Sequence, residues 1–320
     1  MPPKGSAVLL FAAMALSAAA SAQAPYPSQP VRIVVTAAPG AGGDFLTRMI
    51  AQHLSDKWKQ SVVVDNKTGG GGQISAIEAA KAPPDGHTLF VSNDAPAIAP
   101  NTIRNLPLDY RKAFEPVSLL VLVDFKLLVR PDLPANGVAE LVAWAKASPK
   151  PPFFASAGTF TSHHLIGELF RQAAGIEAVH VPFKGAVPEL MSLVAGSSDY
   201  GFAGFSGTGA FIQSGQLREI ATTGQQRNPA TPHLPTVGET IPGFAAFSWF
   251  AMWTRAEVPA AIRTQVWRDV SAFMKLPATV QRVGANGMTA VGSTPEELRA
   301  HLNTEQKKWA GLPAAVLNSN

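Results

Sequence analysis

The sequence contains no cysteine, so no disulfide bond can stabilise the protein and no lipid can be attached to a cysteine. Charged residues are also scarce: they make up 15% of the 320 residues, whereas an average soluble domain has about 25%. The formal net charge of +4 comes from scattered lysines and arginines. Because no basic stripe interleaved with aromatic residues is present, we expect no nucleic-acid partner.

One long apolar stretch is present, from Ala7 to Ala20, and it explains part of the low charge. It follows Lys4 and is followed by small residues, which is typical of a secretory signal peptide. The stretch is shorter than the roughly 20 residues that a membrane-spanning helix needs. We therefore predict a signal peptide over residues 1–22, cleaved after Ala22, and a mature protein exported to the periplasm.

Strand patterns alternate with helical patterns in the first third of the chain. The β-branched run from Val31 to Val35 is typical of a strand buried on both faces. Further strands are expected at Ser61 to Asp65 and at Thr88 to Ser92, and a polar loop is expected after Ser92. Such alternation predicts an α/β fold with a parallel sheet.

Two segments are predicted to connect two lobes. The apolar stretch from Val117 to Val129 is too long for one ordinary strand, so we expect it to run from one lobe into the other. The segment from Pro242 to Arg255 is expected to return the chain, and two helices are expected to finish it. Thr294, Pro295 and Glu297 form a capping-box pattern at the start of the last helix. The predicted lobes are residues 23–124 with 245–320, and residues 125–244, joined by two hinge crossings.

Glycine-rich loops follow the first two strands, at the sheet edge where open α/β folds bind ligands. Glycine lets a ligand approach backbone amides closely, and a helix that begins directly after the loop favours an anion. A dinucleotide fingerprint would need glycine at Phe45 or at Ser75, and a Walker loop would need Gly-Lys-Ser or Gly-Lys-Thr. The loops therefore predict a carboxylate or phosphate site, with ordinary tight turns as the alternative.

Asp44 ends the first glycine cluster, and its carboxylate would repel a bound anion. We therefore predict that Asp44 caps the following helix and forms an ion pair with Arg48, four residues later. The alternative is a salt bridge to the ammonium group of an amino-acid ligand.

Candidates for catalysis or metal binding are few. No Gly-x-Ser-x-Gly pattern is present. His163 and His164 are adjacent, so on a helix they face different directions, and we expect them to be loop or surface residues. His164 and Glu168 share a helical face, but two ligands do not make a zinc site. We therefore predict no catalytic residue, no metal and no cofactor, and an anion-contacting or solvated role for Lys184.

Several long stretches together resemble one known family. They include "YPSQPVRIVV", "APGAGGDFLTRMIAQHL", "VVVDNKTGGGGQISAIEAAKAPPDGHTL", "HHLIGELFRQAAGIEAVHVPFKGAVPELMSLVAG", "LPTVGETIPGF" and "GSTPEELRAHLNTEQKKW". The mature chain is thereby similar to the substrate-binding proteins of tripartite tricarboxylate transporters, the Bug (Bordetella uptake gene) family. The resemblance covers nearly everything after the signal peptide, in the same order.

The resemblance implies a two-lobed periplasmic binding protein, expected as a monomer, that holds a small carboxylate and delivers it to membrane transporter subunits. Backbone amides and ordered waters would hold the carboxylate, and the second lobe would close over it. The ligand-binding positions that it implies are Pro39, Gly40, Ala41, Gly42, Gly43, Asp44, Gly69, Gly70, Gly71, Gly72, Ser92, Asn93, Ser156, Gly158, Thr159, Ser162, Phe183, Lys184 and Gly185.

Two positions depart from the family pattern, which usually has tyrosine where this chain has Phe183 and threonine where it has Gly43. The family's usual dicarboxylates and tricarboxylates therefore do not follow as ligands of this chain. Two other functions stay open at this point. A ligand sensor that signals to a membrane histidine kinase would use the same pocket, and an exported α/β hydrolase would need a nucleophile and base in the cleft.

Overall fold

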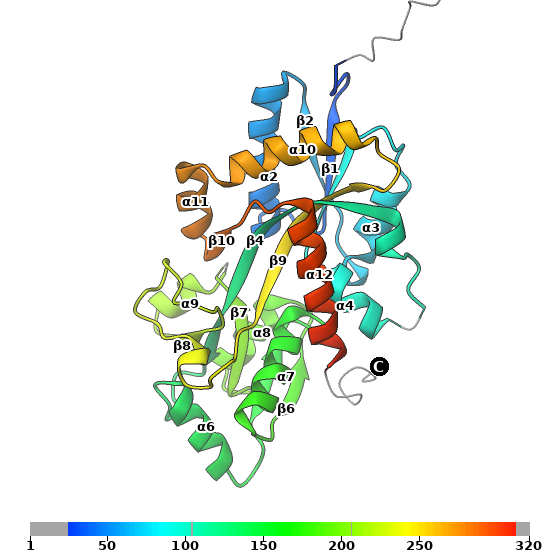
Figure 1. The fold of residues 1–320 in the computed structure, drawn as a ribbon. Helices are drawn as coiled ribbons and strands as arrows, with labels where there is room; N and C mark the ends of the chain where they lie inside the picture. Colours follow the sequence, from blue (N-terminus) through cyan, green and yellow to red (C-terminus); the bar gives the residue numbers. More distant parts are fainter. Residues whose placement is uncertain (1–24, 104, 206, 312–320) are drawn as a thin grey trace, which may run out of the picture.

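The computed structural model describes residues 25–103, 105–205 and 207–311, and it shows an α/β molecule with two lobes (Figure 1). In the first lobe, β1 (Val31–Val35) lies between β2 (Val62–Asn66) and β3 (Thr88–Ser92) and runs parallel to both. The predicted parallel arrangement of these three strands is confirmed. Because the strands are parallel, their carboxyl ends lie at one edge of the sheet, and the loops that follow them are neighbours.

Two long strands join the lobes. Strand β4 (Phe114–Val129) pairs through residues 114–124 with β9 (Phe247–Arg255). Its remaining residues, 125–129, pair with β7 (Tyr200–Gly204), and part of this segment also pairs with β8 (Arg218–Thr222). The long apolar stretch is thus a single strand that belongs to both sheets, and Figure 1 shows β4 and β9 running from the upper lobe toward the lower one.

The second lobe continues the sheet from β7. Strand β5 (Phe153–Ser156) pairs parallel to β7 on one side and to β6 (Val179–Pro182) on the other. The helical segments of the second lobe are α6 (Val138–Ala147), α7 (Ser162–Ala174), α8 (Ala186–Val194), α9 (Gly209–Gln213) and the 3-10 turn η2 (Val237–Glu239). The core of this lobe includes Phe154, Phe170, Tyr200 and Phe202, all fully buried.

The first lobe is covered by helices on both faces of its sheet. They are α2 (Gly42–Trp58), the 3-10 turn η1 (Gly70–Gly72), α3 (Gln73–Ala80), α4 (Ala95–Thr102), α5 (Tyr110–Ala113), α10 (Ala260–Met274), α11 (Pro277–Gly284) and α12 (Pro295–Ala310). Leu46 and Ile50 of α2 share one core cluster with Val270 of α10. Ile98 of α4 and Leu302 of α12 belong to the cluster on the other side.

The end of the chain differs from the prediction. Up to residue 311, three helices follow β9 instead of the two expected, and β10 (Met288–Ala290) adds an antiparallel strand beside β4. The short run at β10 has too few residues to show a strand period, so its pairing with β4 could not be predicted. The capping box of α12 is confirmed: the Glu297 backbone N–H donates to Thr294 Oγ1 at 3.1 Å, and the Thr294 N–H donates to Glu297 Oε2 at 2.8 Å.

A short polar loop, Asn93 and Asp94, follows Ser92 as predicted, but the helix α4 that begins directly after it was not predicted. Pro96 lies in the first turn, where a proline leaves no hydrogen bond unmade. Pro100 lies inside the helix, where proline is costly, but the buried side chains of Ala97 and Ile98 pack in the first-lobe core. Tertiary packing thus overrides the local preference of this proline-containing segment.

The predicted signal peptide and its cleavage site after Ala22 fall in residues 1–24, which lie outside the described residues. Within the described ranges, we find no helix whose length and apolar character would let it span a bilayer.

Candidate ligand-binding cleft between the lobes

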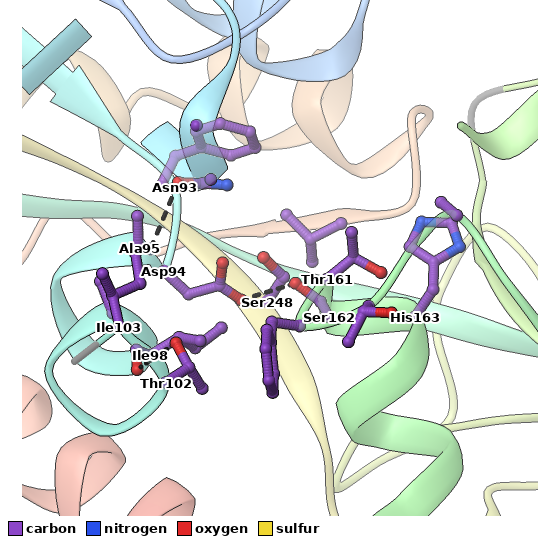
Figure 2. Close-up of a pocket in the computed structure, with 18 of the residues that line it drawn as sticks. Asn93, Asp94, Ala95, Ile98, Thr102, Ile103, Thr161, Ser162, His163 and Ser248 are labelled. Carbon is purple, nitrogen blue, oxygen red and sulfur yellow. Dashed lines mark hydrogen bonds between the residues drawn. The ribbon is translucent and has the colours of Figure 1, made fainter. Parts of the chain in front are cut away.

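A cavity of about 570 Å³ lies where the loops of both lobes meet the crossing strands, and we call it the interlobe cleft (Figure 2). The residues that line it are Gly70, Gly71, Asn93, Asp94, Ala95, Ile98, Ala99, Thr102, Ile103, Val123, Phe125, Ala157, Thr159, Phe160, Thr161, Ser162, His163, Ser248 and Phe250. The volume is within the range of small-molecule sites, about 300 to 1,000 Å³. None of the described lining residues is a lysine or an arginine.

One corner of the cleft is built from backbone. Four consecutive glycines have positive φ angles: Gly69 at 109°, Gly70 at 59°, Gly71 at 59° and Gly72 at 94°. Other residues adopt such angles only with strain, so this loop shape requires glycine. Gly70 and Gly71 line the cleft, and the Gly72 N–H donates to the Gly69 carbonyl at 3.1 Å. The corner can thus present backbone amides to a ligand without side chains in the way.

The opposite wall comes from the second lobe, where the chain enters α7. Thr161 is the N-cap residue of this helix, and Phe160 before it is held at φ 62°, in the left-handed region. The Phe160 N–H donates to Nδ1 of His164 at 3.1 Å, which helps to hold this conformation. Strained residues of this kind persist where surrounding structure fixes them, often at functional sites.

The two adjacent histidines belong to α7, so the prediction that they are loop or surface residues was wrong. His164 is 2% exposed and stacks on His180 with ring centroids 3.8 Å apart. Nδ1 of His163 lies 2.6 Å from Oε2 of the buried Glu189. The two rings do face different partners, because neighbouring residues on a helix diverge.

The first glycine loop lies behind the cleft wall. None of the residues from Pro39 to Asp44 lines the cleft. A Cβ atom at Gly43 would lie 2.5 Å from the ring of Phe250, which does line the cleft. The threonine that the resemblance suggests at position 43 would therefore collide with Phe250. The absence of a side chain at Gly43 leaves room for the ring of Phe250.

Asp44 binds its own loop and helix. Its carboxylate accepts hydrogen bonds from the Gly40 N–H at 2.9 Å and the Asn66 amide at 2.9 Å, and it pairs with Arg48 at 2.9 Å. The ion pair is confirmed, but the predicted cap was wrong. The N-cap residue is Ala41, and Asp44 in the first turn reaches back to the loop. Although burial favours the neutral form, these hydrogen bonds and the charge of Arg48 hold the pKa of Asp44 below its ordinary value.

The other predicted residues divide between the cleft and its surroundings. Gly70, Gly71, Asn93, Thr159 and Ser162 line the cleft. Gly69 and Gly72 belong to the glycine corner but do not line the cleft. Ser92 is buried, and its hydroxyl accepts a hydrogen bond from Trp253 Nε1 at 2.8 Å.

The predicted residues of the second lobe that do not line the cleft lie next to one that does, Ala157. Ser156 and Gly158 are its chain neighbours. The Phe183 and Gly185 N–H groups donate to the carbonyls of Ser156 and Ala157, at 2.9 and 3.1 Å. The Lys184 side chain between them belongs to an exposed residue.

The sequence prediction missed the apolar part of the cleft. Ile98, Ala99 and Ile103 come from α4 and its end, and Phe125 and Phe250 come from the crossing strands. The missed helix explains the first group. One signal could have found this helix: Asp94 and Pro96 are typical residues of a helix start, and the apolar residues Ala95, Ile98 and Ala99 recur at helical spacing.

One side-chain pair has the composition of a nucleophile and base. Ser156 Oγ lies 2.6 Å from Nε2 of His180. However, Ser156 is fully buried and does not line the cleft, so a substrate held there could not reach its hydroxyl. The pair therefore does not favour the hydrolase alternative. Among residues 25–311, apart from 104 and 206, no group of three or more His, Cys, Asp or Glu side chains could hold a metal ion.

Comparisons with known proteins agree with this architecture. The sequence model for the tripartite tricarboxylate transporter family receptor matches residues 46–316. BugT from Bordetella pertussis is 31% identical over 306 residues, which are 95% of this chain and 94% of BugT. The match covers nearly all of both chains, as the resemblance predicted.

Solved structures also have this fold. An R. palustris protein solved with adipate is 30% identical, has a TM-score of 0.80, and covers 89% of this chain and 96% of its own. MatC from Rhodopseudomonas palustris with bound malate is 25% identical, with a TM-score of 0.75, over 92% of this chain and 100% of MatC. The family model spans most of the sequence, and the folds match over nearly their whole length. The chain therefore belongs to the family of tripartite tricarboxylate transporter receptors.

Proposed function

We propose that this protein captures a small carboxylate in the interlobe cleft, in the periplasm, and delivers it to the membrane subunits of a tripartite transporter. The observation that carries the proposal is the corner of positive-φ glycines, because it brings backbone amides to a cleft between two lobes. Amides of this kind bind carboxylates without a cationic side chain. The relatives solved with adipate and malate support the same ligand class.

The hydrogen bonds available suffice for useful affinity. Micromolar binding corresponds to about 8 kcal/mol, and a hydrogen bond to a charged group contributes about 1.5 to 3 kcal/mol. Four such bonds, from the backbone of Gly70 and Gly71, the side-chain amide of Asn93 and the hydroxyl of Thr159, would come to about 6 to 12 kcal/mol. The surplus offsets the entropy lost on association.

We also propose that the lobes are residues 23–124 with 245–320, and residues 125–244. The change of strand partner along β4, between Asp124 and Phe125, supports this boundary. Ligand closure would then bend β4 and β9 near the cleft, because Val123, Phe125 and Ser248 lie both on these strands and in the cleft wall. The mature chain would begin at Gln23, after removal of the signal peptide.

A ligand screen tests the proposed function. Purified mature protein is heated in the presence of small monocarboxylates, dicarboxylates, tricarboxylates and acidic amino acids, and hits are measured by calorimetry. We expect at least one hit with one-to-one stoichiometry. At about 100 times its dissociation constant, the ligand should raise the melting temperature by about 5 °C. If no carboxylate shifts the melting temperature while the protein is folded, the proposed function is wrong.

Asp44→Asn separates a structural from a ligand-binding role of this carboxylate. We expect the free energy of unfolding to fall by about 1 to 3 kcal/mol at neutral pH, because hydrogen bonds to a charged group are lost. Affinity for the ligand found in the screen should stay within about twofold, because Asp44 does not line the cleft. Urea unfolding and calorimetry measure the two quantities. A large loss of affinity for amino acids alone would favour the salt bridge to a ligand ammonium group.

A further inference from the structure

Asp94 places a carboxyl group in the wall of the interlobe cleft. It follows β3 and precedes α4, and it is 2% exposed. Its Oδ2 accepts a hydrogen bond at 2.8 Å from the hydroxyl of Ser162, a residue of the second lobe. Figure 2 shows its side chain reaching toward Ser162 and Ser248. A cleft proposed to hold a carboxylate thus already contains one.

The surroundings of Asp94 do little to neutralise its charge. The side-chain hydrogen-bond partners of Asp94, Ser162 and Ser248, are neutral hydroxyls. Burial raises the pKa of Asp94, and the hydrogen bonds of Ser162 and Ser248 and the charge of Lys308 oppose this only in part. Lys308 itself is paired with Glu305 at 2.7 Å. When Asp94 is ionised, it repels a second negative charge brought into the cleft.

A further acidic group lies behind the cleft wall. His163 lines the cleft, and its Nδ1 contacts the carboxylate of Glu189 at 2.6 Å, so this histidine is already paired with an anion. Because none of the described lining residues is a lysine or an arginine, the anion-binding groups among them are backbone amides, the side-chain amide of Asn93 and hydroxyls. Those groups can solvate one carboxylate at the glycine corner.

Much of the remaining wall is apolar, although Thr102, Thr161 and Ser248 also line it. Ile98 and Ile103 lie at one side, and Phe125, Phe160 and Phe250 come from the crossing strands and the second lobe. Apolar atoms of a ligand are favoured against such side chains, whereas a second carboxylate would lose its hydration there without new partners. The apolar wall and the charge of Asp94 therefore both favour a ligand with one carboxylate and an apolar body.

We propose that the interlobe cleft selects monocarboxylates with an apolar body, and that Asp94 is the specificity-determining residue that rejects a second carboxylate. This inference rests on the proposed function and deepens it. The carboxylate of the ligand lies at the glycine corner, and its hydrocarbon part lies against α4 and the phenylalanines. The selectivity thus differs from that of the relative solved with adipate, a dicarboxylate.

The repulsion between Asp94 and a second ligand carboxylate should change the affinity enough to be measured. Two unit charges about 6 Å apart in a partly buried site, with an effective dielectric constant of about 20, repel each other enough to weaken binding by about 100-fold. Partial protonation or ligand movement lowers this figure. We therefore expect at least about a 30-fold preference for a monocarboxylate over its dicarboxylate of equal chain length.

Matched ligand pairs test the inference. Hexanoate and adipate share a six-carbon chain, and benzoate and isophthalate share an aromatic ring, so each pair differs by one carboxylate. Calorimetry at about pH 8 keeps the ligand carboxylates ionised and favours the charged form of Asp94, whose pKa is raised by burial. We expect wild type to prefer the monocarboxylate in at least one pair. Asp94→Asn should shrink that preference at least about tenfold, mainly by strengthening dicarboxylate binding.

Two further variants serve as controls. Asp132→Asn changes the net charge equally at an exposed position, so it should leave the preference unchanged. Asp94→Ser removes the charge with a different polar group, and it replaces Asp94→Asn if the latter does not fold. Thermal unfolding establishes that each variant is folded.

The possible results separate the inference from the proposed function. Dicarboxylates bound as tightly as their monocarboxylates in both pairs, or a preference unchanged by both Asp94 variants, would overturn the inference. The inference would also be overturned if none of the four ligands binds while other carboxylates do, because the cleft would then not recognise an apolar ligand body. If no carboxylate of any kind binds, the proposed function itself fails.

Discussion

Gly71→Phe should abolish ligand binding while leaving the protein folded. Gly71 has a φ of 59°, lines the cleft, and has no heavy atom within 4 Å of the position that a Cβ would take. A phenylalanine there extends into the open space that Gly71 borders and occupies the amide corner. We expect affinity for the screened carboxylate to fall at least about 100-fold, because several hydrogen bonds to the charged group are lost.

The backbone strain of this substitution needs a matched control. A non-glycine residue in the left-handed region costs about 1 to 2 kcal/mol. Gly215 has a φ of 71°, likewise leaves open space where a Cβ would lie, and does not line the cleft. Gly215→Phe should therefore lose similar stability in urea unfolding and keep wild-type affinity in calorimetry.

Two outcomes would contradict this account of the glycine corner. If Gly71→Phe binds the carboxylate as wild type does, the amides of this corner do not contact the ligand. If Gly215→Phe loses affinity to the same extent, the loss at Gly71 reflects strain or general destabilisation. Measuring both variants against the same ligand distinguishes these cases.

Local patterns predicted the parts of this fold that depend on local physics. The β-branched run of β1, the glycine corner and the capping box of α12 each express a backbone preference within a few residues. The position of the loops at one sheet edge followed from the parallel order of β2, β1 and β3. These steps needed no knowledge of distant contacts.

The apolar half of the cleft could not be predicted in the same way. Pro100 inside α4 argued against a helix in the sequence, and the helical state of α4 depends on packing against α12 at the far end of the chain. The ring of Phe250 packs against Gly43 within the first lobe, and Ser162 donates a hydrogen bond to Asp94 between the lobes. Each contact joins segments far apart in sequence, so only the tertiary structure shows that charge and apolar surface meet in one cleft.

The stacked pair His164 and His180 should make the second lobe sensitive to acid. Burial, reinforced by the charge of His180, lowers the pKa of His164 to about 3, and burial lowers the pKa of His180 to about 4. An unfolded histidine has a pKa of about 6.5. As the pH falls below that value, the unfolded chain therefore binds protons before the folded chain does, and unfolding is favoured.

The size of the effect follows from the same difference. Each pH unit between the unfolded and folded pKa values contributes up to about 1.4 kcal/mol per histidine. Between about pH 6.5 and pH 4.5, the pair should lower the free energy of unfolding by about 2 to 5 kcal/mol, since the rings interact and do not titrate independently. Burial raises the pKa of Asp94, Asp124, Glu189 and Glu305, which works in the opposite direction.

A comparison of variants isolates the histidines from these carboxyl groups. Glutamine does not titrate, and its amide can still meet the Ser156 hydroxyl from position 180 or the Phe160 N–H from position 164. Urea unfolding of His180→Gln and His164→Gln at several pH values should give flatter stability curves than wild type. The gap to wild type should change by about 2 to 3 kcal/mol per histidine toward pH 4.5. His233→Gln makes the same substitution at an exposed histidine and serves as the matched control. If the stability curves of the buried variants run parallel to that of wild type, the stacked pair does not control acid stability.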